Sequence, residues 1–176
     1  MPPRKPIAST ALSADSTNLI KVLGEGSDFT VVIVGLSYLD ACLTALLSQY
    51  FRTSSISDEL LDANKGPLGS LVTKAKLAYA LGLIYKPFLQ DILVLAELRN
   101  TVAHSHAELN FEIPAVKSLC ERLSLITTIK RLDSTGPLFA EALYQRPRDR
   151  FILSAVVIWG HILSIAHDIK RVEEQA

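Results

Sequence analysis

The stretch that decides the fold is Phe29–Phe51, FTVVIVGLSYLDACLTALLSQYF. Its apolar residues lie on most sides of a helix, and a helix of that kind is buried at the centre of a protein. Asp40 is the single charged residue in this stretch. Because a buried carboxylate needs a partner, we expect Asp40 to form an ion pair, with Arg99 and Lys76 as the candidate cations.

Capping residues, glycines and prolines divide the rest of the chain into further helices. Ser27 or Asp28 is placed to cap the central helix. The other predicted helices cover residues 15–23, a segment that starts at 57–59, then 70–81, 87–104, 114–132 and 148–174. No alternating strand pattern is longer than a few residues. We therefore predict an all-α, compact single-domain helical bundle of about six or seven helices over residues 14–176, after a disordered arm over residues 1–13.

The overall charge disfavours unaided binding to DNA. The chain has 18 Lys and Arg against 18 Asp and Glu, whereas a protein that grips duplex DNA shows a basic excess or stripe. We interpret the local basic clusters as solvated helix faces; they are Lys74/Lys76, Lys130/Arg131 and Arg146/Arg148/Arg150. Hydrophobic residues make up 49% of the chain, and packing against a second copy would bury part of them. We therefore expect a homodimer.

Cysteine and histidine spacing predicts neither a metal site nor a cofactor. Cys42 and Cys120 each lie in an apolar helical pattern without a C-x-x-C motif, which is typical of buried reduced thiols. Residues 29–51 and 151–169 are long enough to span a membrane. However, polar groups at bilayer depth are costly, and these segments carry Asp40, His161 and His167 among others. The sequence therefore favours a cytoplasmic protein with no membrane segment.

The motif with the richest chemistry is Arg99-Asn100-Thr101-Val102-Ala103-His104. Arginine grips phosphate, and histidine moves protons near neutral pH. On a helix Asn100 and His104 share a face, whereas the Cβ directions of Arg99 and His104 differ by about 140°. The motif is therefore either a metal-free ribonuclease site, closed by an uncoiled helix end or a second chain, or a polar junction between helices. We interpret His161 and His167 as satisfied core or interface histidines.

Several segments together resemble the mannitol operon repressor-like family. The matching segments are Leu39–Leu43, Pro67–Ser70, Lys74–Ile84, Glu97–Asn100 and Ala103–His104. The resemblance covers residues 27–105 and is weaker in the C-terminal half. The arrangement of Arg99, Asn100 and His104 also resembles the signature of the broader HEPN superfamily.

The resemblance implies a bacterial transcriptional regulator with an all-helical fold. With zero net charge and no obvious helix-turn-helix, we expect it to act through a protein partner rather than by direct DNA binding. The HEPN-like signature implies the alternative, a metal-independent endoribonuclease that binds RNA and uses Arg99 and His104, with Asn100 as an orienting group. Under either hypothesis the candidate polar cluster is Asp40, Lys76, Arg99, Asn100 and His104.

Overall fold

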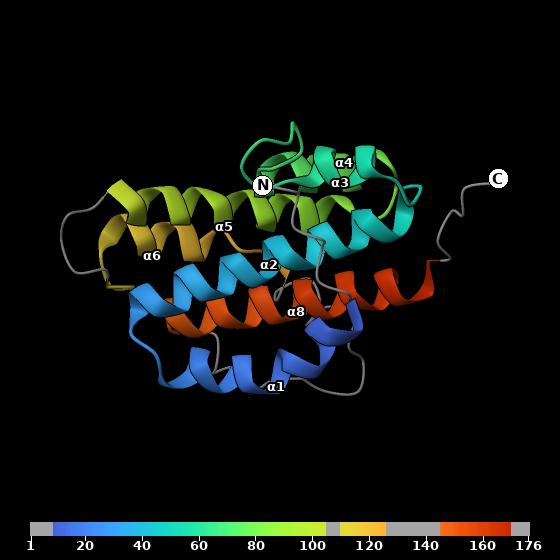
Figure 1. The fold of residues 1–176 in the computed structure, drawn as a ribbon. Helices are drawn as coiled ribbons and strands as arrows, with labels where there is room; N and C mark the ends of the chain where they lie inside the picture. Colours follow the sequence, from blue (N-terminus) through green and yellow to red (C-terminus); the bar gives the residue numbers. More distant parts are fainter. Residues whose placement is uncertain (1–8, 105–109, 126–144, 170–176) are drawn as a thin grey trace.

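The computed structural model describes residues 9–104, 110–125 and 145–169. Its described residues form seven helices and no strand, which confirms the all-α prediction. In chain order the helices are α1 (Ser9–Glu25), α2 (Asp28–Tyr50), α3 (Ser55–Leu61), α4 (Leu71–Ala80), α5 (Lys86–His104), α6 (Pro114–Glu121) and α8 (Pro147–Asp168) (Figure 1).

The central helix is α2, as its sequence predicts. It packs against α1, α3, α4, α5 and α8, and its buried residues run from Val31 to Leu47. Its partner on one side is α8, which lies along it in Figure 1. At this contact Gly35 permits a close approach, because a Cβ added there would lie 3.3 Å from a ring carbon of Phe151. A larger residue at position 35 would push the two longest helices apart.

Several helices begin and end where the sequence places their signals. The hydroxyls of Ser27, Ser54 and Ser70 accept from backbone N–H groups three residues later, at the starts of α2, α3 and α4. Prolines open α6 and α8, where the missing N–H is not needed. Gly82 follows α4 with φ of 73°, a left-handed conformation that glycine adopts without steric cost.

The first helix begins earlier than the sequence suggested. It starts at Ser9, six residues before the predicted start, so residues 9–13 belong to α1 and not to an arm. The physical reason is tertiary: Leu12 is buried, and its carbonyl accepts a hydrogen bond from Tyr38 Oη of α2. These contacts stabilise the helix although the hydrophobic periodicity of residues 9–13 is weak. Residues 1–8 lie outside the described part of the chain.

The helix predicted over residues 114–132 is interrupted near its middle. Helix α6 ends at Glu121, and the buried carboxylate of Asp91 accepts from Ser124 N at 2.9 Å and from Leu125 N at 3.0 Å. These backbone N–H groups are thereby satisfied outside a continuous helix. Burial raises the pKa of the Asp91 carboxyl, although the donors from Ser124 and Leu125 oppose the rise. Residues 126–132 lie outside the described part.

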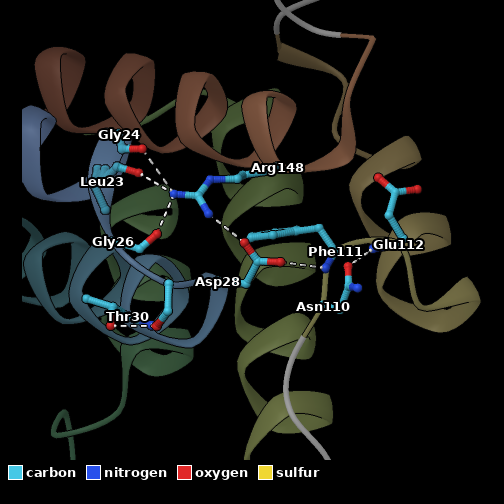
Figure 2. A network of polar contacts seen from close by, with 10 residues as sticks. Leu23, Gly24, Gly26, Asp28, Thr30, Asn110, Phe111, Glu112 and Arg148 are labelled. Carbon is cyan, nitrogen blue, oxygen red and sulfur yellow. Dashed lines mark hydrogen bonds and ion pairs between the residues drawn. The ribbon is translucent and has the colours of Figure 1, made fainter.

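One arginine and one aspartate join three segments that are distant in sequence (Figure 2). Arg148, at the start of α8, donates to Asp28 Oδ1 at 2.6 Å and to the carbonyl of Gly26 at 2.6 Å. The same guanidinium reaches the carbonyls of Leu23 and Gly24 at the end of α1. The other oxygen of Asp28 accepts from the backbone N–H of Phe111 at 3.0 Å. The planar guanidinium group has several N–H donors and can bind these acceptors together, whereas the ammonium group of a lysine cannot.

Two helices, α2 and α8, are long and apolar enough to cross a membrane by length and composition. In this fold 61% of the apolar window of α2 and 39% of that of α8 is buried against the rest of the protein. The core helix of a soluble protein passes the same test, so the two helices are weak indications of a membrane protein.

Substitution of Arg148 by Ala should lower the free energy of unfolding by about 2–4 kcal/mol, because it leaves Asp28 and three carbonyls without their donor. The matched control is Arg146→Ala, since Arg146 is exposed and pairs only with Asp149 in the described part of the chain. We expect that control to cost less than about 0.5 kcal/mol. Urea unfolding of both variants measures the difference, and equal losses would contradict the role given to Arg148.

Candidate functional site

The Arg99–His104 motif forms the C-terminal end of α5, as predicted. Arg99 and Asn100 are both exposed, and no hydrogen bond or ion pair within the described residues involves either side chain. The backbone of His104 ends α5, while its side chain lies outside the described part. The exposure of Arg99 and Asn100 does not fit a buried polar junction between two helices. It leaves them available to a ligand or a partner.

The partner of Asp40 is Lys74 of α4, which corrects the prediction of Arg99 or Lys76. Lys74 Nζ donates to both carboxylate oxygens, at 2.9 and 2.8 Å. The lysine side chain is 1% exposed and that of Asp40 is 27% exposed. Lys76 is two residues further along α4 and is exposed. The two residues project from different faces of the helix because they are about 200° apart around its axis. The ion pair thus fastens α4 to α2.

The candidate polar cluster as a whole stays a prediction, because the side chain of His104 lies outside the described part of the chain. No hydrogen bond or ion pair there joins any two of Asp40, Lys76, Arg99 and Asn100. Asp40 stabilises the core, whereas the other three described residues are exposed.

Three cations of the local basic clusters bind groups of the protein, whereas Lys76 and Arg146 are exposed. Lys74 is buried against Asp40, and Arg148 holds Asp28 and the end of α1. Arg150 donates to the carbonyl of Leu123 at 2.9 Å, and Arg122 pairs with Glu97 at 2.9 Å. These cations contribute little positive potential to a surface for phosphates. Lys130 and Arg131 lie outside the described residues.

Histidines 161 and 167 on α8 differ from one another. His161 stacks on Phe88 of α5, with ring centroids 4.1 Å apart, and Tyr85 lies nearby. Its Nε2 is buried and has no hydrogen-bond partner in the described structure, so it is not the fully satisfied histidine that was expected. Burial lowers the pKa of His161. His167 is exposed beside Asp168, so it is not a core residue, and its interpretation as an interface histidine stays a prediction.

The two cysteines are free and buried, as the sequence predicts. Burial raises the pKa of Cys42 and of Cys120 to about 12, so neither thiol is a ready nucleophile. Among the described residues no group of three or more His, Cys, Asp and Glu side chains is placed to hold a metal ion.

Sequence reasoning missed three residues that organise the molecule: Lys74, Asp91 and Arg148. For Lys74 a signal was present, because it lies three and four residues from the apolar Leu71, Leu77 and Ala78 on one face of its helix. Asp91 had a similar setting, between Gln90 and the apolar residues 92–96. Nothing in the sequence pointed Arg148 toward the end of α1.

Removal of the Lys74 side chain should destabilise the protein far more than removal of that of Lys76. Lys74→Ala leaves Asp40 unpaired and opens a cavity, so the expected loss is about 2–4 kcal/mol. Lys76→Ala, the matched control, should change the stability by less than about 0.5 kcal/mol. Thermal and urea unfolding measure both. In the double variant Asp40→Ala/Lys74→Ala the losses should be less than additive; full additivity would show that the two groups do not interact.

The stacked His161 should make stability fall in mild acid. The folded state holds the imidazole neutral, while the unfolded chain takes up a proton near pH 6.5. Stability from this group is therefore complete above about pH 6.5 and decreases as the pH falls through the lowered pKa of the folded state. His161→Phe should flatten the dependence in urea unfolding between about pH 7.5 and 5.5. His167→Phe is the control, and an unchanged slope in His161→Phe would refute the assignment.

Comparisons with known proteins agree with this fold. The sequence matches the mannitol repressor family over residues 24–170. The structure is similar to a chain in the X-ray structure of the MtlR–HPr complex from Escherichia coli, with a TM-score of 0.64 and 25% identity, covering 85% of this chain and 98% of that one.

It is also similar in fold to YggD from Shigella flexneri 2a strain 2457T, a possible transcriptional regulator. That match has a TM-score of 0.60 and 15% identity and covers 90% of this chain and 99% of that one. No curated protein sequence gives a significant match. The family match extends from the end of α1 to the end of α8 and so includes the central helix, the Asp40–Lys74 pair and the Arg148 contacts. The chain belongs to the mannitol repressor family.

Proposed function

We propose that this protein is a bacterial transcriptional regulator that acts through contact with a protein partner rather than by binding operator DNA itself. The observation that carries the proposal is the structural match to a chain captured in a complex with HPr, which spans nearly all of both chains. HPr, or a protein of that kind, is therefore the first partner to test. The family match supports the regulatory role independently.

The distribution of charge supports a partner-mediated mechanism. The net charge is zero, so the chain as a whole has no excess of positive charge to offer to a phosphate backbone. A protein that grips duplex DNA unaided shows a basic excess or stripe. A protein interface has no such requirement, since its centre is depleted in charge.

We place Arg99 and Asn100 on the candidate partner surface. Both are exposed at the end of α5 and have no contact within the described residues that would occupy them. Arginine is enriched in protein interfaces, where its fork can bind a carboxylate or phosphate bidentately. The ribonuclease hypothesis for Arg99, Asn100 and His104 stays a prediction, because no contact of the described residues assembles them into one site.

Three further properties are part of the proposal. The protein is cytoplasmic, a homodimer, and one helical domain. Large apolar side chains exposed on the described surface, among them Phe29, Ile56 and Tyr85, support an association between copies. Sedimentation analysis across a range of concentrations would measure the dimer.

Calorimetric titration with HPr of the source organism tests the proposed mechanism. We expect a dissociation constant in the micromolar range or tighter, which corresponds to about 8 kcal/mol. Arg99→Glu should weaken this binding without changing stability, whereas Arg146→Glu, at an exposed arginine of another helix, should leave it unchanged.

Selection from a random duplex DNA pool at physiological salt is the complementary measurement. The isolated protein should select no specific sequence from the pool, because its net charge is zero and it has no basic excess with which to bind the phosphates. Nanomolar, sequence-specific binding of DNA by the protein alone would overturn the partner-mediated mechanism.

A further inference from the structure

A cleft of about 400 Å³ opens between α1, α2 and α8, on a part of the molecule that neither the Asp40–Lys74 and Asp28–Arg148 pairs nor the Arg99 motif uses. Its walls are apolar and come from all three helices: Ile20, Tyr38, Val156, Trp159 and Leu163. Ile20 is 49% exposed, although it is one of the large apolar side chains. A concave apolar site of this size is typical of small-molecule binding.

The glycine in the cleft has no role in the fold. Gly160 lies in the middle of α8, where glycine weakens a helix relative to alanine. Its φ is not in the left-handed region, and a Cβ added there would meet no atom within 4 Å. Neither backbone conformation nor packing therefore requires a glycine at this position. By contrast, Gly35 of α2 is needed for a close helix contact. The absence of a side chain at position 160 leaves the cleft open.

The lining also has a polar edge and an aromatic floor. Ser164 and His167, one turn and two turns beyond Gly160 on α8, supply a hydroxyl and an imidazole. The rings of Tyr38 and Trp159 meet edge to face, with centroids 4.8 Å apart. Aromatic walls favour an aromatic guest, and the groups at the edge favour a guest with one polar or anionic substituent.

We propose that this cleft binds a small amphiphilic aromatic molecule, with its rings against Tyr38 and Trp159 and its polar group toward Ser164 and His167. Such a ligand contacts α1 through Ile20, α2 through Tyr38 and α8 through the remaining residues. It therefore strengthens the attachment of α1 to the two core helices. This inference does not depend on which protein partner the chain binds.

The test uses 8-anilinonaphthalene-1-sulfonate, an aromatic anion small enough for the cleft, as the probe. The chain has one tryptophan, Trp159, which lies in the cleft wall, so its emission reports directly on binding. Titration of the wild-type protein should give saturable quenching of Trp159 with a single site and should raise the melting temperature.

Gly160→Leu is the blocking variant, because its side chain extends into the open space without a clash. We expect it to weaken probe binding by about tenfold or more and to melt no lower than the wild type. Gln90→Leu is the matched control: it places the same side chain at an exposed helical position of α5, a helix that does not line the cleft. It should bind the probe within about twofold of the wild type.

Equal binding by the wild type and Gly160→Leu would overturn the proposal, as would equal weakening by both leucine variants. The other possible occupant is an apolar side chain of a protein partner. In that case the probe would not bind, and Gly160→Leu would weaken the complex with HPr. That outcome would also overturn the small-molecule assignment. By contrast, a wild-type protein that binds the probe but does not bind HPr would contradict only the proposed function.

Discussion

A helix that is apolar on nearly every side cannot lie at a surface, and this constraint on α2 governs the rest of the structure. Its side chains between Val31 and Leu47 are covered by α1, α4, α5 and α8, each of which contributes an apolar face. Burial of this kind is the main favourable term in folding. Asp40, the charged residue in the middle of α2, is paired with Lys74 of α4. The arrangement of the other helices around α2 follows from the need to bury its apolar side chains.

Two arginines at the start of α8 close the bundle through charged contacts. Arg148 pairs with Asp28 and donates to the carbonyls at the end of α1, which carry the negative end of the helix dipole. Arg150 donates to the carbonyl of Leu123. Other cations, such as Lys76 and Arg99, are exposed and have no partner within the described residues.

Local signals predicted most of the helices. Serine caps, opening prolines and Gly82 act within one helical turn, so the sequence alone locates the starts of α2, α4, α6 and α8 and the end of α4. The predictions were wrong where a distant residue intervenes. Leu12 packs into the core and accepts a hydrogen bond from Tyr38 of α2, which lengthens α1, and Asp91 of α5 binds backbone N–H groups just after the end of α6. Neither contact is visible in a window of neighbouring residues.

The sequence by itself determined the all-α class, the central position of α2, the burial of both cysteines and the family. It also placed Arg99 and Asn100 at the end of one helix, because periodicity and motif spacing are properties of consecutive residues. Only the tertiary structure decided that Asp40 pairs with Lys74, 34 residues away, and not with Lys76 or Arg99. Two neighbouring lysines on α4 look alike in the sequence. Which of them reaches the carboxylate depends on the rotation of α4 against α2, and the packing of many side chains sets that rotation together.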